Sequence, residues 1–369
     1  MQRIPARAGD RIEAIETPAL VVDLDPFERN LDRMVAATKG VRLRPHAKAH
    51  KCATIAKAQI ARGAVGICCQ KTDEAAALVG AGIRNVLVTN EVVAPTKLAR
   101  LAELGRAATI GVLVDAAPAI APLSQAAIRA RATLDVYVEV DVGAHRCGAE
   151  PGEPAVAVAR AVADAPGLRF RGIHAYQGTA QHLREPQARA DAIAAAVGEA
   201  RATRALLDAA GLHCEVVTGA GTGTWRHERD SGVYDELQPG SYVFMDADYN
   251  RNVWDDSDLR FEQSLFVLAS TMSAPAPDRA IVDAGLKAFA FDSGLPQVHD
   301  RAGIEYVKAS DEHGVLRVAD GAMPMTLGER VWLVPGHCDP TVNLYDFIVA
   351  VRAGVVSAVW RIEARGTLG

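Results

Sequence analysis

The stretch Arg44-Pro45-His46-Ala47-Lys48-Ala49-His50-Lys51 ends the apolar alternation of residues 41–43 and predicts a β-strand that opens into a basic segment. Two histidines and two lysines within six residues do not build a hydrophobic core. Because each positive charge disfavours the charged form of its neighbours, we expect the pKa of a lysine here to be lowered. A partly neutral amine is nucleophilic enough to hold a carbonyl compound as a Schiff base. A solvated basic turn before a helix is the alternative interpretation.

Short apolar runs alternate with alanine-rich helical stretches from residue 41 to about residue 250. We predict eight strands, near residues 41–46, 64–69, 85–90, 108–115, 134–142, 168–176, 214–219 and 240–245. Helices are predicted between them, for example at 53–62, 74–79, 96–104, 154–164 and 187–210. This alternation predicts an α/β fold, a parallel (β/α)8 barrel of the TIM type, and an open doubly wound sheet is the structural alternative.

From about residue 255 the pattern changes into short strand-like runs separated by Gly, Pro and Asp. The runs are 264–273, 279–282, 315–318, 330–334, 344–351 and 355–362. Strands without intervening helices predict a C-terminal all-β domain. We therefore expect a barrel domain over residues 18–250 and a β domain over residues 251–369, joined by residues 1–17. The strand expected at 19–25 precedes the eight, and it either joins the β domain or covers the base of the barrel.

Composition places the chain among globular proteins with a large core. Of the 369 residues, 49% are hydrophobic and 23% are charged, and the net charge of −5 comes with no basic run that would predict nucleic-acid binding. No stretch approaches the 18 apolar residues of a membrane helix, and residues 1–16 lack the apolar core of a signal peptide. Six cysteines without a paired framework predict a reduced, cytoplasmic setting. We therefore expect neither nucleic acid nor a membrane as a partner.

Polar and glycine-rich segments follow the seventh and eighth predicted strands, where barrels commonly bind phosphate. In the segment Thr218–Thr224, backbone N–H groups and hydroxyls can cradle a phosphate, and the residues expected to do so are Gly221, Thr222 and Gly223. Gly240 and Ser241 can add two more donors. A flexible turn is the alternative for this loop. A phosphate here, with a lysine after the first strand, predicts pyridoxal phosphate held as an imine.

Other strand ends carry side chains suited to such a cofactor. Arg146 can bind the phenolic oxygen of the cofactor or a substrate carboxylate, and a surface ion pair with Asp141 is the alternative. Tyr176 can line the cofactor ring, and ordinary packing is the alternative. Gln70 ends the second predicted strand and is a further candidate for cofactor binding.

The predicted β domain contains one more constellation, Pro335-Gly336-His337-Cys338-Asp339-Pro340. In an extended segment side chains alternate, so we expect His337 and Asp339 to face one way and Cys338 the other. An imidazole and a carboxylate so placed can bind one divalent metal, with open positions for water and substrate. A nitrogen and a hard oxygen favour Mn²⁺ or Mg²⁺, with Zn²⁺ as a further candidate. The alternative is an interfacial turn with a hydrogen-bonded histidine.

Taken together, these segments resemble the fold-type III pyridoxal enzymes, the alanine racemase-like group, over essentially the whole chain. Residues 44–51 look like the lysine motif of its D-threonine aldolase and D-serine dehydratase branch. Asp141-x-Gly143-x-x-Arg146-x-Gly148 is similar to the arginine motif of the group, and Pro239-Gly240-Ser241-Tyr242 to its phosphate-contacting strand end. The segments that look most like the D-threonine aldolases are 66–71, 219–224, 242–246 and His337-x-Asp339-Pro340.

The resemblance implies roles for particular residues. Lys48, rather than Lys51, would hold the cofactor, Tyr176 would contact its pyridine nitrogen, and Tyr242 would belong to the phosphate site. Gln238 stands where racemases place an arginine. Without a cationic partner the ring withdraws electrons less strongly, which limits racemisation and favours chemistry completed at Cβ. The metal ligands of the family map onto His337 and Asp339.

The activity that the resemblance implies is reversible retro-aldol cleavage of a D-β-hydroxy-α-amino acid, for example D-threonine to glycine and acetaldehyde. His182 is a candidate for the base that removes the hydroxyl proton. The alternative within the family is a D-serine or D-3-hydroxyaspartate dehydratase, although those relatives more often show His-x-Cys than His-x-Asp. A non-catalytic pyridoxal-phosphate homeostasis protein is the alternative outside enzymes, but such proteins lack the β domain. The resemblance also implies a homodimer in which each site is closed by the β domain of the other subunit.

Overall fold

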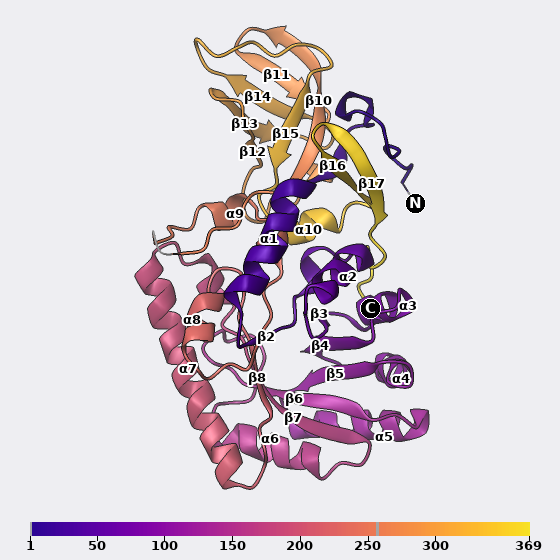
Figure 1. Ribbon diagram of the computed structural model, residues 1–369, viewed down its shortest axis with the longest axis vertical. Helices are drawn as coiled ribbons and strands as arrows, with labels where there is room; N and C mark the ends of the chain where they lie inside the picture. Colours follow the sequence, from indigo (N-terminus) through magenta and orange to yellow (C-terminus); the bar gives the residue numbers. More distant parts are fainter. Residues whose placement is uncertain (1, 256–257) are drawn as a thin grey trace.

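Eight parallel strands form the lower body of the molecule in the computed structural model, which describes residues 2–255 and 258–369 (Figure 1). Their order is β2 (Arg42–Leu43), β9 (Glu236–Leu237), β8 (Val216–Gly219), β7 (Leu168–Ala175), β6 (Leu134–Glu139), β5 (Thr109–Val114), β4 (Asn85–Glu91) and β3 (Ile67–Cys69). The ring closes beyond β2, because the N–H of Val65 donates to Leu43 O and that of Cys68 to Pro45 O, each at 2.9 Å. The predicted barrel is therefore confirmed, and the open-sheet alternative is wrong.

Helices cover the outside of this barrel. They are α2 (Ala53–Ala61), α3 (Thr72–Gly80), α4 (Pro95–Leu104), α5 (Ile120–Ala130), α6 (Glu153–Ala163), α7 (Pro186–Ala209) and α8 (Trp225–Asp230). Helix α4 shows why they form: Pro95 stands at its first turn, and Leu98 and Leu101, three residues apart, lie on one buried face. Among the described residues, no helix has the length and apolarity that crossing a bilayer requires.

The last strand of the barrel lies earlier in the chain than expected. We predicted it near 240–245, whereas β9 covers Glu236–Leu237 and Ser241–Val243 forms a turn of 3-10 helix. Pro239 has no backbone N–H to extend the sheet, and Met245 adopts a left-handed φ of 56°, so the segment turns instead of continuing. Gly240 and Ser241 consequently lie beyond the strand, at the open end of the barrel.

A second sheet stands at the other end of the molecule (Figure 1). Its strands run β13 (Ile304–Ala309), β14 (Gly314–Val318), β11 (Arg279–Val282), β10 (Leu265–Ala276), β1 (Ala19–Asp23), β16 (Phe347–Arg352) and β17 (Val355–Arg361), and β15 (Arg330–Val334) pairs with β10 and with β12 (Gln297–Val298). Strand β1 lies between β10 and β16, so of its two expected positions the structure shows the one in the β part. Strand β13 had not been predicted, because its charged residues obscure the alternation.

The two parts meet where short helices pack against the strand ends. Helix α1 (Leu24–Ala37) leads from β1 to the barrel, and α9 (Ala247–Asn250) and α10 (Cys338–Val342) lie at the junction (Figure 1). Backbone hydrogen bonds join them: the N–H of Ala247 donates to Pro335 O at 3.0 Å, and that of Asp248 to Gly336 O at 3.1 Å. The carboxylate of Asp246 accepts the N–H of Cys338 at 2.8 Å. These bonds hold the β part against the open end of the barrel.

Candidate active site

A cavity of about 330 Å³ opens at the C-terminal ends of the barrel strands, a size typical of small-molecule sites. It is lined by most of the residues predicted for the site: Lys48, Gln70, Arg146, Tyr176, His182, Gly221, Thr222, Gly240 and Ser241. The other predicted residues, Gly223, Tyr242, His337 and Asp339, are not among its lining. Side chains that follow different strands of one parallel barrel meet here because the strands all end at the same rim.

Lys48 carries its amine from the short 3-10 turn Ala47–Ala49 into this cavity. Its Nζ lies 3.2 Å from Asp339 Oδ2, and the lysine side chain keeps 41% of its surface exposed. The negative charge of Asp339 raises the pKa of Lys48, although burial acts in the opposite direction. The expectation of a lowered pKa is therefore wrong, because the nearest charge is a carboxylate from the β part and not one of the neighbouring basic residues.

Lys51 points elsewhere. Its Nζ lies 2.9 Å from Glu74 Oε1 and donates to Asn343 Oδ1 at 3.0 Å, and its backbone has a left-handed φ of 49°. A lysine amine occupied by a buried carboxylate and an amide has a structural role. Of the two lysines in the motif, only Lys48 lines the cavity.

Asp339 reaches Lys48 from a helix and not from an extended segment. Helix α10 begins at Cys338, so the alternation expected for residues 337–339 is wrong. Burial alone would raise the pKa of the Asp339 carboxyl, but the charges of Lys48 and His337 lower it well below its usual range. Ser241 Oγ also donates to Asp339 Oδ1, at 3.1 Å. An ionised carboxylate thus contacts both the Lys48 amine and the Ser241 hydroxyl.

His337 precedes the helix and pairs with a different carboxylate. Its Nδ1 lies 2.6 Å from Asp292 Oδ2, which fixes the ring orientation. A histidine so held by a carboxylate presents its other nitrogen, a pattern typical of metal-ligating histidines. Among residues 2–255 and 258–369, no group of three His, Cys, Asp or Glu side chains is arranged to hold a metal ion.

The glycine-rich loop is held in shape by Gln181. Gln181 Oε1 accepts the N–H of Gly223 at 2.9 Å, and its Nε2 donates to Thr224 Oγ1 at 2.8 Å. A Cβ on Gly221 would lie 2.4 Å from Gln181 Oε1, so glycine is required for this contact. The N–H of Gly223 is therefore already used, whereas Gly221 and Thr222 line the cavity. Two hydrogen bonds from Gln181 thus fix the loop beside the cavity.

The segment after β9 completes this end of the cavity. A Cβ on Gly240 would lie 2.7 Å from His46 O, so the two strand ends approach closely only with glycine there. The N–H of Tyr242 donates to Thr222 Oγ1 at 3.1 Å, which joins the segment to the loop after β8. The Tyr242 ring is buried away from the cavity, and its hydroxyl accepts from Gln59 Nε2 at 3.3 Å.

Arg146 and Tyr176 lie together on another wall. The Arg146 guanidinium stands 5.8 Å from the centre of the Tyr176 ring, and its Nη2 donates to Glu139 Oε1 at 3.4 Å. Asp141 instead contacts His145, at 3.0 Å. The alternative of an Arg146–Asp141 ion pair is therefore wrong, and the arginine faces the cavity.

Sequence reasoning missed the lining residues Thr89 and His174, and it named His46 and Gln238 without giving them a role in the site. His46 Nδ1 accepts the N–H of Lys48 at 3.2 Å, so the proton of the neutral ring lies on Nε2, which contacts Thr89 Oγ1 at 2.8 Å. His174 Nε2 contacts Gln238 Oε1 at 3.2 Å, and burial lowers the pKa of His174 to about 4. The signal available in the sequence for both histidines was a polar residue at the carboxyl end of an apolar strand.

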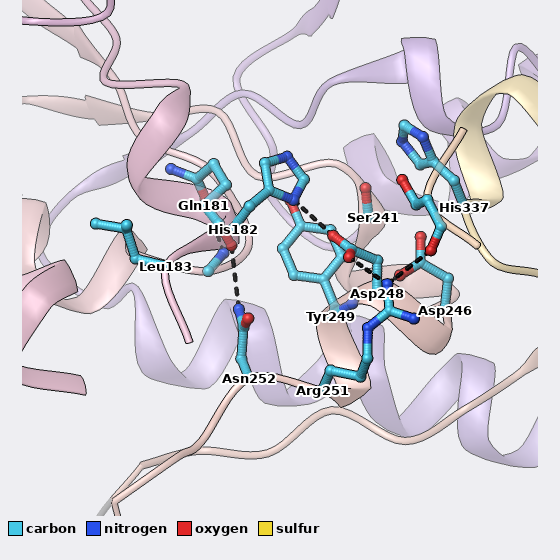
Figure 2. Close-up of polar contacts among 12 residues, drawn as sticks. Gln181, His182, Leu183, Ser241, Asp246, Asp248, Tyr249, Arg251, Asn252 and His337 are labelled. Carbon is cyan, nitrogen blue, oxygen red and sulfur yellow. Dashed lines mark hydrogen bonds and ion pairs between the residues drawn. The ribbon is translucent and has the colours of Figure 1, made fainter. Parts of the chain in front are cut away.

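His182 also lines the cavity, and it ends the 3-10 turn Thr179–His182 (Figure 2). Half of its side chain is exposed, and its Nδ1 lies 2.6 Å from Asp248 Oδ2. Ser241, Asp246 and His337 appear in the same view, beyond Asp248. The lining of the cavity thus includes an amine, a guanidinium and an imidazole, a set of groups suited to binding an anion and to acid–base chemistry.

The fold and this cavity define a class of protein, and the chain belongs to the alanine racemase-like family. The model of the alanine racemase N-terminal domain matches residues 22–248, and that of the putative serine dehydratase domain matches residues 264–351.

Within this family the chain is similar to aldolases. It is 50% identical to the D-threonine aldolase of Arthrobacter sp. over 364 residues, which cover 98% of this chain and 96% of that protein. It is 46% identical to the 3-hydroxy-D-aspartate aldolase of Paracoccus denitrificans (strain Pd 1222) over 372 residues, 98% of this chain and 95% of the relative. The crystal structure of a D-threonine aldolase from Filomicrobium marinum matches with a TM-score of 0.97 at 50% identity, covering 99% of this chain and all of the other.

Glu228 is a buried carboxyl group next to the glycine-rich loop. Glu228 Oε1 accepts from Thr224 Oγ1 at 2.7 Å, and its Oε2 has no hydrogen-bond partner among the described residues. Burial raises the pKa of Glu228 from 4.5 to about 7, and the bond from Thr224 only partly offsets this. Between these two pH values the unfolded chain releases a proton that the folded protein keeps, so this group lowers stability as pH rises.

We therefore expect Glu228→Gln to raise the free energy of unfolding more at pH 8 than at pH 4.5, by up to roughly 3 kcal/mol. This additional stability should appear between pH 4.5 and 7. Urea unfolding of both proteins across this range measures the difference. Glu103→Gln, on the exposed surface, controls for the loss of one charge. A difference that does not change with pH would show that Glu228 ionises normally in the folded protein.

Proposed function

We propose that this protein is a pyridoxal-phosphate-dependent lyase that reversibly cleaves D-β-hydroxy-α-amino acids between Cα and Cβ, such as D-threonine into glycine and acetaldehyde. The observation that carries the proposal is the placement of the Lys48 amine in a cavity that the glycine-rich cradle borders on one side and His182 on another. The 50% identity to a D-threonine aldolase over nearly the full chain supports the same activity.

The residues present fit pyridoxal phosphate. Lys48 would hold its aldehyde carbon, and the donors of Gly221, Thr222, Gly240 and Ser241 would hold its phosphate. Tyr176, Arg146 and Gln70 would surround the ring, with Arg146 free to bind its phenolic oxygen or a substrate carboxylate. When bound, the cofactor supplies an electron sink for the electron pair left on Cα.

A divalent metal is the second proposed cofactor, with His337 and Asp339 as its ligands. The Asp292 contact leaves His337 Nε2 available, and Asp339 is an ionised carboxylate. Two protein ligands leave positions for water and substrate, and a nitrogen with a hard oxygen favours Mn²⁺ or Mg²⁺ over Zn²⁺. When bound, the metal supplies a Lewis acid that lowers the pKa of the substrate β-hydroxyl.

The chain itself supplies the proton transfers. His182 Nε2 would accept the proton of the β-hydroxyl, and the electron pair of that O–H bond becomes the new C=O bond as Cα–Cβ breaks. Glycine then needs one proton at Cα, and the Lys48 ammonium is the acid that lines the cavity. Arg146 would keep the substrate in place through its carboxylate. The aldehyde leaves through the opening at which His182 stands.

Two alternative functions have less support from the sequence and the structure. A D-serine or D-3-hydroxyaspartate dehydratase would use the same cavity, but the chain has Asp339 where such relatives more often have a cysteine. A non-catalytic pyridoxal-phosphate protein needs no β part, whereas here Asp339 of that part contacts the cofactor lysine. The domain boundary near residue 250, the homodimer with each site closed by the partner, the cytoplasmic location and the lack of nucleic-acid or membrane partners remain proposals.

The cofactor lysine can be identified chemically. Borohydride reduction of the yellow protein, followed by peptide mapping, should place the pyridoxyl label on Lys48 because its amine alone of the two reaches the cavity. Lys51→Arg should still take the label and Lys48→Arg should not. A label on Lys51, or no label at all, would contradict the assignment.

The products distinguish the candidate reactions. With D-threonine and Mn²⁺ we expect acetaldehyde and glycine in equal amounts, measured by a coupled alcohol dehydrogenase assay and amino-acid analysis. L-threonine, which presents the opposite face at Cα, is the control substrate. Ammonia and 2-oxobutanoate would instead identify a dehydratase, and no turnover of any D-β-hydroxy amino acid would favour the non-catalytic protein.

Metal dependence tests the second cofactor. Dialysis against a chelator should abolish cleavage while the visible absorbance of the cofactor remains, and Mn²⁺ should restore the rate. Cys338→Ala should keep this rescue, whereas Asp339→Ala should lose it because the carboxylate ligand is gone. If Cys338→Ala is the variant that loses metal, the ligand assignment is wrong and the dehydratase alternative gains support.

A further inference from the structure

The imidazole of His182 is held by a carboxylate outside the cavity lining. Asp248, on α9, lies with its Oδ2 2.6 Å from His182 Nδ1 (Figure 2). The Asp248 side chain is only 6% exposed, whereas that of His182 is 51% exposed and reaches the cavity. The carboxylate therefore stands behind the ring, on the side away from the expected substrate.

The Asp248 carboxylate stays ionised because two arginines also donate hydrogen bonds to it. Its Oδ1 accepts from Arg184 Nη2 at 2.5 Å and from Arg251 Nη2 at 2.7 Å. Burial alone would raise the pKa of Asp248, but the hydrogen bonds from Arg184, Arg251 and His182 lower it to about 2. An ionised carboxylate can only accept hydrogen bonds, so the proton must lie on His182 Nδ1. The lone pair of the neutral ring is then on Nε2.

The loop that carries His182 is fastened independently of this contact. Arg184 Nη1 donates to Asp248 O at 2.8 Å and to Asn252 Oδ1 at 2.7 Å. Asn252 Nδ2 donates to Gln181 O at 3.1 Å (Figure 2). Arg251 Nη2 also donates to Ser293 O at 2.7 Å. The loop thus has several anchors, and the carboxylate of Asp248 is the one that touches the imidazole itself.

We propose that Asp248 is a positioning residue for His182: it fixes the tautomer with hydrogen on Nδ1 and aims the basic Nε2 into the cavity. The inference rests on the proposed function in one respect, namely that His182 is the base for the β-hydroxyl. An amide in place of the carboxylate would let the ring adopt the other tautomer, with Nε2 protonated and unable to accept the hydroxyl proton.

A double-mutant cycle separates positioning from mere support of the loop. Asp248→Asn should lower kcat for D-threonine roughly 10–100-fold with little change in KM. In the His182→Ala background the same substitution should cause no further loss, because its effect acts through the imidazole. Equal losses in both backgrounds would overturn the proposal. Asp235→Asn removes a carboxylate paired with Arg204, before β9 and away from the cavity, and serves as the matched control.

The tautomer can be observed without turnover. In the holoenzyme labelled with 15N-histidine, the His182 ring signals, identified by their absence in His182→Gln, should show a protonated Nδ1 and a bare Nε2 near neutral pH. A proton on Nε2 alone would overturn the proposal even if Asp248→Asn does not fold. If the expected tautomer is present but D-threonine is not cleaved, the proposed function fails and the Asp248–His182 arrangement stands.

Discussion

The contact between Lys48 and Asp339 joins the two parts of the molecule at the place where its chemistry is expected. One charge follows the first strand of the barrel, and the other lies in α10 of the β part, 3.2 Å away. The Asp339 side chain is only 12% exposed, and a buried charge without a partner costs several kcal/mol, so this carboxylate depends on the Lys48 amine. The backbone bonds from Ala247 and Asp248 to residues 335–336 bring them together. The carboxylate that pairs with the Lys48 amine is therefore in place only when the β part is docked on the barrel.

A carboxylate in contact with Nδ1 holds each of two histidines near the cavity, His182 and His337. Asp248 accepts from Nδ1 of His182, and Asp292 lies equally close to Nδ1 of His337, in both cases at 2.6 Å. Each ring thereby presents Nε2, which we propose accepts a proton in His182 and binds a metal ion in His337. The two contacts are linked, since Arg251 joins Asp248 to the carbonyl of Ser293, the neighbour of Asp292. The same physical rule thus orients both histidines: a carboxylate next to Nδ1 leaves Nε2 as the nitrogen that is free to interact.

Local signals in the sequence were enough for the barrel, for the β part and for half of the cavity lining. Alternating strands and helices imply a closed parallel sheet whose strand ends meet, so polar residues at those ends could be grouped before any coordinates. Errors arose where a contact between distant residues decided the outcome. The pKa of Lys48 is raised by Asp339, which is 291 positions away in the chain.

The sequence by itself determined which residue types reach the rim of the barrel, because strand periodicity and glycine content are properties of short segments. Only the tertiary structure decided the partners of these residues. Nothing near His182 in the chain indicates Asp248, and residues 337–339 read as extended although Cys338 starts a helix. Charge and proton position depend on distances through space, and those are set when the β part packs against the barrel.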